Sequence, residues 1–135
     1  MEQVTLIKGA IHRPDEPRHF MEYSYPSTRY VATINNTVIG DSVAVLKLSE
    51  VGYHIYDPVI YLPLADLDME LLRPSAKTSH CPLKGDTNYY DFVRDDSLIE
   101  AVGWCYSAPL DFAKTLADYA AFDSRIVTLT RHDES

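Results

Sequence analysis

The segment TRYVATINNTVIG, residues 28–40, decides the fold, because it has the pattern of a β-hairpin. Side chains in its first half alternate, so that one face of an extended chain would carry Tyr30, Ala32 and Ile34. Alternation of this kind is typical of a strand with one buried side. Asn35 and Asn36 follow, and asparagine tolerates the left-handed backbone that a two-residue hairpin turn requires. Residues 37–40 then predict the returning strand.

Working outward, other short apolar segments show the same period of two. We expect extended chain over residues 59–62, 87–93, 98–106 and 126–130. Pro63 ends the first of these, because proline has no N–H to give to a strand ladder. Residues 42–49 fit a strand and also a short helix, and both interpretations stay open. Many short strands with few helices predict a mainly β fold built from antiparallel sheets.

Two short helices are expected. Residues 64–73 carry leucines at helical spacing, and Asp66 suits the helix N-cap. Pro109 is favoured in the first turn of a helix, which predicts a helix over residues 109–116. Residues 119–122 fit either a helix or a strand.

Length and composition predict one folded domain. The chain has 135 residues, of which 46% are hydrophobic, and this supports a packed core. Residues 1–27 read as an extended N-terminal arm, because Pro14 and Pro17 lie among charged residues. We expect a single domain over residues 28–131 and a short tail over residues 132–135.

The formal net charge of -8 disfavours nucleic acid as a partner, because an acidic surface repels phosphate. No apolar run approaches the roughly 20 residues of a spanning helix, so no membrane is expected. The first ten residues lack the pattern of a secretion signal. Two cysteines without paired spacing make no disulfide framework, so a cytoplasmic protein with reduced thiols is predicted. A bridge between Cys81 and Cys105 stays open.

One turn concentrates reactive groups within six residues. It holds His80, Cys81 and Lys84 beside the stiff Pro82 and the permissive Gly85. Nearby cations favour the reactive thiolate form of a cysteine, and a rigid loop can present a lysine to an anion. The alternative is an ordinary turn in which Cys81 serves as a small buried hydrophobic residue.

An aromatic wall is predicted beside this turn. In the strand over residues 98–106, a period of two places on one face Val102, Trp104 and Tyr106. Together with Tyr90 or Tyr89 they could line a pocket for a planar or cationic ligand, although Trp104 could equally belong to the core. Glu50 ends an apolar segment, where its carboxylate either faces solvent or acts as a base.

Metal and cofactor sites are not expected. A structural zinc site needs paired ligands, whereas the other histidines are scattered at His12, His19, His54 and His132. Asp66 and Asp68 are two apart on an expected helix, so they point in different directions. No glycine-rich phosphate loop is present in the sequence. We therefore predict neither a metal nor a cofactor.

The order of these motifs resembles the family known as domain of unknown function 427, also labelled nucleotidyltransferase-like. The resemblance extends from about Thr28 to Val127. Its most specific part is the Cys81-Pro82-x-Lys84-Gly85 segment followed by tyrosine. The other matching residues are Gly40, Asp41, Ser42, Glu50, Tyr61, Leu62, Pro63, Asp66, Trp104, Tyr106, Pro109, Ala121 and Phe122.

The resemblance implies a β-tent, in which two small antiparallel sheets meet at an angle around a cleft. This fold is shared with zinc-bearing modules and B-type methionine sulfoxide reductases, whose zinc-binding cysteine pairs are missing from this sequence. The resemblance favours a strand over residues 119–122. Asp123 stands where the family usually has an aromatic residue. The residues it assigns to the cleft are Asp41, Ser42, Glu50, Cys81, Lys84, Tyr89, Trp104 and Tyr106.

These observations predict a domain that binds a small polar or anionic molecule, with Lys84 holding the ligand's charge. In an enzyme of this kind, Glu50 would act as base, Lys84 would stabilise negative charge, and Cys81 would be a further reactive group. One alternative is a thiol-dependent, reductase-like enzyme centred on Cys81. The other is a module for protein association, and a homodimer is also left open. Whether the domain catalyses a reaction is not decided by the sequence.

Overall fold

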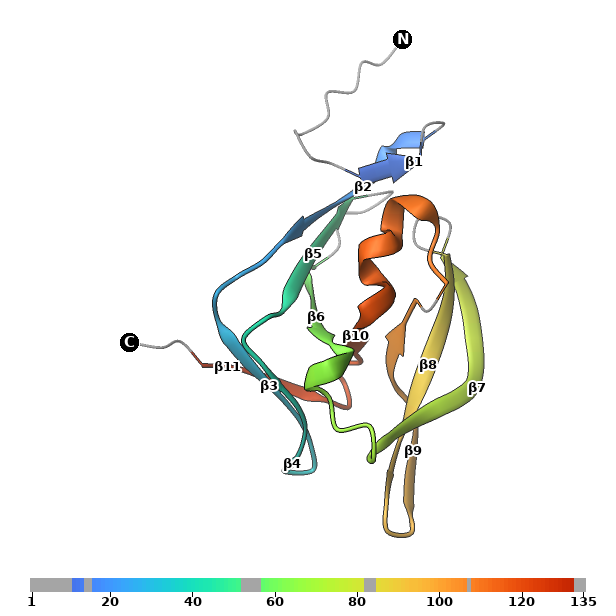
Figure 1. The fold of residues 1–135 in the computed structure, drawn as a ribbon. Helices are drawn as coiled ribbons and strands as arrows, with labels where there is room; N and C mark the ends of the chain where they lie inside the picture. Colours follow the sequence, from blue (N-terminus) through green and yellow to red (C-terminus); the bar gives the residue numbers. More distant parts are fainter. Residues whose placement is uncertain (1–10, 14–15, 52–56, 82–84, 107, 133–135) are drawn as a thin grey trace.

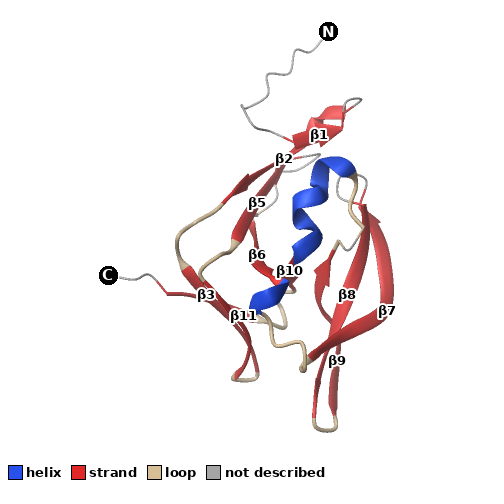
Figure 2. Cartoon of the chain, viewed as in Figure 1, coloured by secondary structure: helices blue, strands red, loops and turns tan. Residues whose placement is uncertain are grey.

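The described residues of the chain fold into two antiparallel sheets and two short 3-10 helices (Figures 1 and 2). The computed structural model describes residues 11–13, 16–51, 57–81, 85–106 and 108–132. The larger sheet has the strand order β1-β2-β5-β6-β10-β9-β8-β7, and the smaller sheet has the order β11-β3-β4. The predicted mainly β fold, a β-tent of two antiparallel sheets with short helices, is confirmed.

The bounds of the elements are β1 Ile11–Arg13, β2 Glu16–Ser24, β3 Arg29–Ile34, β4 Thr37–Ser42, β5 Leu46–Val51, β6 Val59–Pro63, η1 Leu64–Asp66, β7 Leu72–Cys81, β8 Gly85–Arg94, β9 Ser97–Cys105, η2 Asp111–Asp118, β10 Tyr119–Phe122 and β11 Thr128–His132. None of the helices in the described ranges is long and apolar enough to cross a membrane.

The predicted hairpin is confirmed as β3 and β4. Ile34 pairs with Thr37 across the turn, and Asn35 and Asn36 have φ angles of 48° and 67°. Both asparagines therefore adopt the left-handed backbone that a two-residue hairpin turn requires. β5 shows that residues 46–51 are a strand, and β10 shows the same for residues 119–122.

The helix expected over residues 64–73 is wrong apart from its first turn. Only η1 is helical, its N-cap is Pro63, and Asp66 instead accepts a hydrogen bond of 2.6 Å from the Ser42 hydroxyl. Backbone pairing with distant strands overrides the local leucine spacing. The Asp68 N–H donates to the Ile39 carbonyl at 2.8 Å, which ties this segment to β4.

The helix predicted over residues 109–116 forms two residues later, as η2. Ala113 and Leu116 are fully buried and pack in the same cluster as Met21 of β2 and Leu46 of β5. In Figure 1, η2 lies between the part of the larger sheet that carries β2 and β5 and the part that carries β8. The helix therefore covers one end of the concave face of this sheet.

A bulge in β9 corrects one predicted strand face. Ala101 has a φ of 53°, and its N–H donates to the buried Asp91 carboxylate at 2.8 Å. The register between β8 and β9 shifts at this point. As a result Val102 packs in the cluster of Cys105, whereas Trp104 and Tyr106 belong to the other cluster.

Buried side chains form two separate clusters. The aliphatic core lies towards the smaller sheet and consists of Ala32, Ile34, Ile39, Val45, Leu62, Leu67, Leu72, Phe92, Val102, Cys105, Ala120 and Val127. The tyrosine-rich core lies beneath η2 and consists of Met21, Leu46, Leu48, Tyr61, Tyr106, Ala113, Leu116 and Ala121, with Tyr23, Val59, Trp104 and Tyr119 partly buried against it. Among the described residues, the buried tyrosines Tyr61 and Tyr106 thus lie on the concave face of the larger sheet.

The region predicted as an N-terminal arm contributes a strand to the larger sheet. β2 pairs with β5 over residues 20–24, and Met21 is fully buried. The division into an arm, a domain over residues 28–131 and a tail stays a prediction.

Candidate ligand-binding cleft

Two adjoining cavities meet beside Trp104 and share part of their lining. The β11 cavity has a volume of about 680 Å³ and is lined by Asp57, Pro58, Val59, Ile60, Trp104, Phe122, Asp123, Ser124, Arg125, Val127, Thr128 and Leu129. The β7 cavity has a volume of about 410 Å³ and is lined by Val59, Tyr61, Lys77, Ser79, His80, Thr87, Tyr89, Ala101, Trp104, Tyr106, Asp123 and Arg125. They share Val59, Trp104, Asp123 and Arg125, so we treat them as one cleft, the Trp104 cleft.

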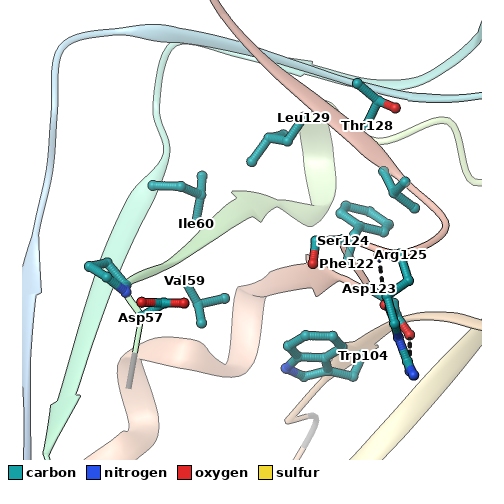
Figure 3. A pocket seen from close by; sticks show the side chains of 12 residues that line it. Asp57, Val59, Ile60, Trp104, Phe122, Asp123, Ser124, Arg125, Thr128 and Leu129 are labelled. Carbon is teal, nitrogen blue, oxygen red and sulfur yellow. Dashed lines mark hydrogen bonds and ion pairs between the residues drawn. The ribbon is translucent and has the colours of Figure 1, made fainter. Parts of the chain in front are cut away.

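Strand register explains why the indole of Trp104 stands in this cleft. Trp104 of β9 pairs with Tyr89 of β8 on one side and with Ala121 of β10 on the other. Ala121 is fully buried and carries only a methyl group, so it leaves room for the indole. Trp104 remains half-buried and lies at the base of the β11 cavity in Figure 3.

A glycine allows β9 and β10 to pack closely behind the cleft. Gly103 pairs with Phe122, and a Cβ at Gly103 would lie 2.7 Å from a ring carbon of Phe122. A side chain at this position would therefore displace the Phe122 ring. Because Phe122 lines the β11 cavity, the shape of that cavity depends on this glycine.

The wall of the β7 cavity carries a cation over an aromatic ring. The Lys77 ammonium lies 4.6 Å from the centre of the Tyr89 ring, an arrangement that stabilises a cation. The hydroxyls of Tyr89 and Ser79 are 2.9 Å apart and hydrogen-bonded. Within the described part of the chain, Lys77 makes no ion pair with a carboxylate. An ammonium and two hydroxyls thus stand together beside Trp104.

An ion pair lies where the two cavities meet. The guanidinium of Arg125 donates to both carboxylate oxygens of Asp123, at 3.0 and 2.7 Å (Figure 3). The Asp123 side chain is 18% exposed, whereas that of Arg125 is 87% exposed. Hydrogen bonds from Arg125, together with the charge of Lys77, hold the pKa of the Asp123 carboxyl below its ordinary value. Asp123 is therefore ionised and bound to Arg125 at neutral pH.

A second pair of oppositely chargeable side chains lies near the C-terminal end of β7. His80 Nδ1 and a carboxylate oxygen of Asp86 are 2.9 Å apart, and both side chains are largely exposed. An exposed pair of this kind contributes little to stability. No group of three His, Cys, Asp or Glu side chains that could hold a metal ion occurs among the residues with described positions.

The sequence matches the family model described as Domain of unknown function (DUF427) over residues 24–133. The chain belongs to the DUF427 family. The match extends over most of the chain and confirms the resemblance seen in the sequence motifs. No curated protein matches this DUF427 domain in sequence.

Three of the residues assigned to the cleft by the DUF427 resemblance come together in the β7 cavity. These are Tyr89, Trp104 and Tyr106. Tyr106 is buried in the tyrosine-rich core, while Tyr89 and Trp104 are half-buried. Their position follows from strand alternation, which was readable in the sequence.

The turn over residues 80–85, which the sequence predicts to be reactive, is described only at its edges. Lys84 lies outside the described residues, and Cys81 is the last residue of β7, with its backbone paired to Gly85 and its side chain not described. Ser79 and His80, the two residues before Cys81, line the same cavity as Trp104. Gly85 is buried with a φ of 111° and forms a bridge with Pro109. A side chain at Gly85 would be strained there.

The remaining predicted residues, Asp41, Ser42 and Glu50, line neither of the two cavities. Asp41 makes a two-bond ion pair with the Arg29 guanidinium at 2.8 and 2.7 Å on the exposed surface of the smaller sheet. Ser42 is buried, donates to Asp66, and accepts a hydrogen bond from the Ala44 N–H at 3.0 Å. Both have clear structural roles in this DUF427 domain, and their place in the cleft stays a prediction.

Glu50 lies near the end of β5, paired with Met21, and is half-buried. Strand alternation places it on the same face as Leu46 and Leu48, which belong to the tyrosine-rich core. Its side chain is therefore directed to the concave side of the larger sheet, and a role as base stays a prediction.

Sequence reasoning missed Lys77 and Arg125, the lysine and the arginine among the described residues that line the cleft. The signal for Lys77 was its spacing, because residues 77, 79 and 81 alternate onto one face of an extended chain. The signal for Arg125 was its place two residues after Asp123, the position where this chain departs from the family pattern.

Proposed function

We propose that this DUF427 domain binds a small anionic molecule in the Trp104 cleft. The observation that supports the proposal most directly is the Lys77 ammonium, held over the Tyr89 ring and beside Trp104 without a carboxylate partner among the described residues. A lysine in this state can pair with an incoming carboxylate or phosphate oxygen. The size of both cavities lies within the range of about 300–1,000 Å³ that is usual for small-molecule sites.

The charge of the whole protein supports the same proposal. The net charge is -8, yet the described residues that line the cleft include Lys77, Arg125 and hydroxyl donors. Of its acids, Asp123 is already neutralised by Arg125, and Asp57 lies on the other side of the β11 cavity (Figure 3). Electrostatic attraction is therefore concentrated at the β7 cavity, where the aromatic wall would pack against the rest of the ligand.

Catalysis is a separate part of the proposal. It assigns Glu50 as base, Lys84 as the group that stabilises negative charge, and Cys81 as a reactive thiol. The position of Ser79 and His80 in the β7 cavity supports placing the neighbouring turn at its rim. Labelling of Cys81 with iodoacetamide across pH tests the thiol. A thiol pKa at or above the ordinary value of about 8.5 would remove Cys81 from the reactive groups.

Intrinsic fluorescence offers a direct test of binding, because Trp104 is the only tryptophan in the chain. The domain is titrated with mononucleotides, sugar acids and small carboxylic acids while indole emission and melting temperature are recorded. We expect a saturable change in emission and a higher melting temperature with at least one class of anion. Neutral sugars should produce neither effect.

Two matched variants identify the cations responsible. Lys77→Ala should weaken binding about tenfold or more, since a hydrogen bond to a charged group is worth about 1.5–3 kcal/mol. Lys114→Ala removes an exposed lysine from η2, outside both cavities, and should leave the dissociation constant unchanged. If no anion alters emission or melting temperature, or if both variants bind equally well, the proposed function is wrong.

A further inference from the structure

The β11 cavity differs in chemistry from the β7 cavity, and this difference bears on the shape of the ligand. Its walls are mainly apolar and come from β6, β9, β10 and the segment that leads into β11. Ile60, Phe122 and Leu129 surround the space above Trp104 in Figure 3. Leu129 is 37% exposed, so its side chain still has apolar surface to bury on binding.

We infer that the ligand is an amphipathic monoacid, with its charged group at Lys77 and an apolar chain or ring in the β11 cavity. The inference rests on the proposed function and deepens it. The two cavities share Trp104 and Val59, so one molecule can cross from one to the other along the indole. The charged group of such a molecule would then contact the polar β7 cavity, and its apolar group would contact the apolar β11 cavity.

Charge limits the ligand to a single acid group. Lys77 is the cation that stands without a carboxylate partner among the described lining residues, because the guanidinium of Arg125 already holds Asp123. At the far side of the β11 cavity, Asp57 is exposed and would repel a second negative group (Figure 3). A ligand with several phosphates would therefore meet repulsion where an apolar group would find contact.

A homologous series of straight-chain carboxylates, from acetate to octanoate, tests the inference by Trp104 fluorescence. Each added methylene that reaches the β11 cavity should lower the dissociation constant about fourfold, given roughly 0.8 kcal/mol for each buried methylene. The straight-chain alcohols of the same length should bind at least tenfold more weakly, because they carry no charge for Lys77.

Variants separate the two halves of the site. Leu129→Ser should flatten the dependence of affinity on chain length, whereas Lys77→Ala should weaken every acid by a similar factor and preserve that dependence. Val38→Ser changes an exposed apolar residue of β4, outside both cavities, and should alter neither property. Leu129 and Val38 are both partly exposed, so folding should survive in each variant, and melting temperatures will verify this.

The outcomes distinguish the inference from the function on which it rests. If acetate and octanoate bind equally, or alcohols bind as well as acids, the amphipathic ligand is wrong while anion binding can stand. If none of the acids binds and no other anion changes emission or melting temperature, the proposed function fails as well. A steep dependence on chain length that Leu129→Ser abolishes supports the inference.

Discussion

The two sides of the larger sheet show how one sheet can serve as both core and site. The aliphatic core is made mainly of Ala, Val, Ile and Leu, which pack without leaving polar atoms to satisfy. The tyrosine-rich core holds Tyr61 and Tyr106 inside and Tyr23, Tyr119 and Trp104 at its border. Rings with a polar tip pack on one side and need water or a partner on the other. A face made from them is therefore suited to remain partly open.

The largest predicted effect belongs to the aliphatic core. Leu62 is fully buried, so Leu62→Ala should lower the free energy of unfolding by about 3 kcal/mol through lost burial and a remaining cavity. The matched change Leu129→Ala, at a partly exposed residue of the cleft, should cost less than about 1 kcal/mol. Urea unfolding measures both. Equal losses of unfolding free energy in the two variants would show that the cleft is packed as tightly as the aliphatic core and would contradict the contrast drawn between them.

The next largest loss of stability should come from removing a buried hydroxyl at the edge of the aliphatic core. Ser42→Ala removes the hydrogen bond to Asp66 and the acceptor of the Ala44 N–H, and should cost about 1–2 kcal/mol in urea unfolding. Ser124→Ala changes an exposed serine of the β11 cavity and should cost almost nothing. Ligand affinity should be unchanged in Ser42→Ala. If Ser42→Ala were as stable as the wild type but lost binding, Ser42 would take part in the cleft, as the family resemblance implies.

Removing a buried hydroxyl from the tyrosine-rich core should give a small gain in stability. The buried Tyr23 hydroxyl has no hydrogen-bond partner among the described residues, so Tyr23→Phe should raise the free energy of unfolding by about 1 kcal/mol at pH 7. Burial, and then the neighbouring Tyr25 and Tyr61, raise the pKa of Tyr23. The wild type should therefore lose stability as pH rises above about 10, where the unfolded tyrosine ionises first, and the variant should lose less.

Urea unfolding at pH 7 and pH 11 measures this difference. Tyr25→Phe is the control, because Tyr25 is 61% exposed. The control should match the wild type at pH 7. A Tyr23→Phe variant less stable than the wild type at pH 7 would mean that the Tyr23 hydroxyl is hydrogen-bonded in solution. The tyrosine-rich core would then hold no unsatisfied hydroxyl at this position.

The sequence predicted those features that depend on neighbours along the chain. The hairpin at Asn35 and Asn36 follows from the local backbone preference of asparagine, and the placement of Trp104 and Tyr106 on one face follows from strand alternation. The helix over residues 64–73 failed because pairing of Asp68 with Ile39 depends on chain brought from far away. Local propensity does not contain that information.

The cleft was predictable to the same extent. Its lining residues Tyr89 and Trp104 were named from the sequence, because they lie in strands whose faces can be read from the period of two. Lys77 and Arg125 were missed, since their proximity to Trp104 depends on how β7 and the segment after β10 curve around the indole. Val102 was assigned to the wrong face because the bulge at Ala101 depends on the Asp91 carboxylate of the neighbouring strand.

The smallest expected effect concerns the exposed pair on the smaller sheet. Hydrogen bonds from Arg29 hold the pKa of the Asp41 carboxyl below its ordinary value, so any stabilisation is present above the unfolded pKa of about 3.9 and is lost as pH falls through the folded pKa. Because both side chains are exposed, Asp41→Asn should leave the melting temperature at pH 7 unchanged and only slightly flatten its decline at acidic pH.

Ligand titration of the same variant decides whether Asp41 belongs to the cleft. On the present geometry, Asp41→Asn should bind as the wild type does, because Asp41 lines neither cavity and its carboxylate is held by Arg29. Asp123→Asn is the matched change inside the cleft, and it should alter affinity by releasing Arg125 to contact the ligand. Equal changes in affinity for the two variants would show that the smaller sheet takes part in binding, so the contrast between a closed core and an open cleft would no longer hold.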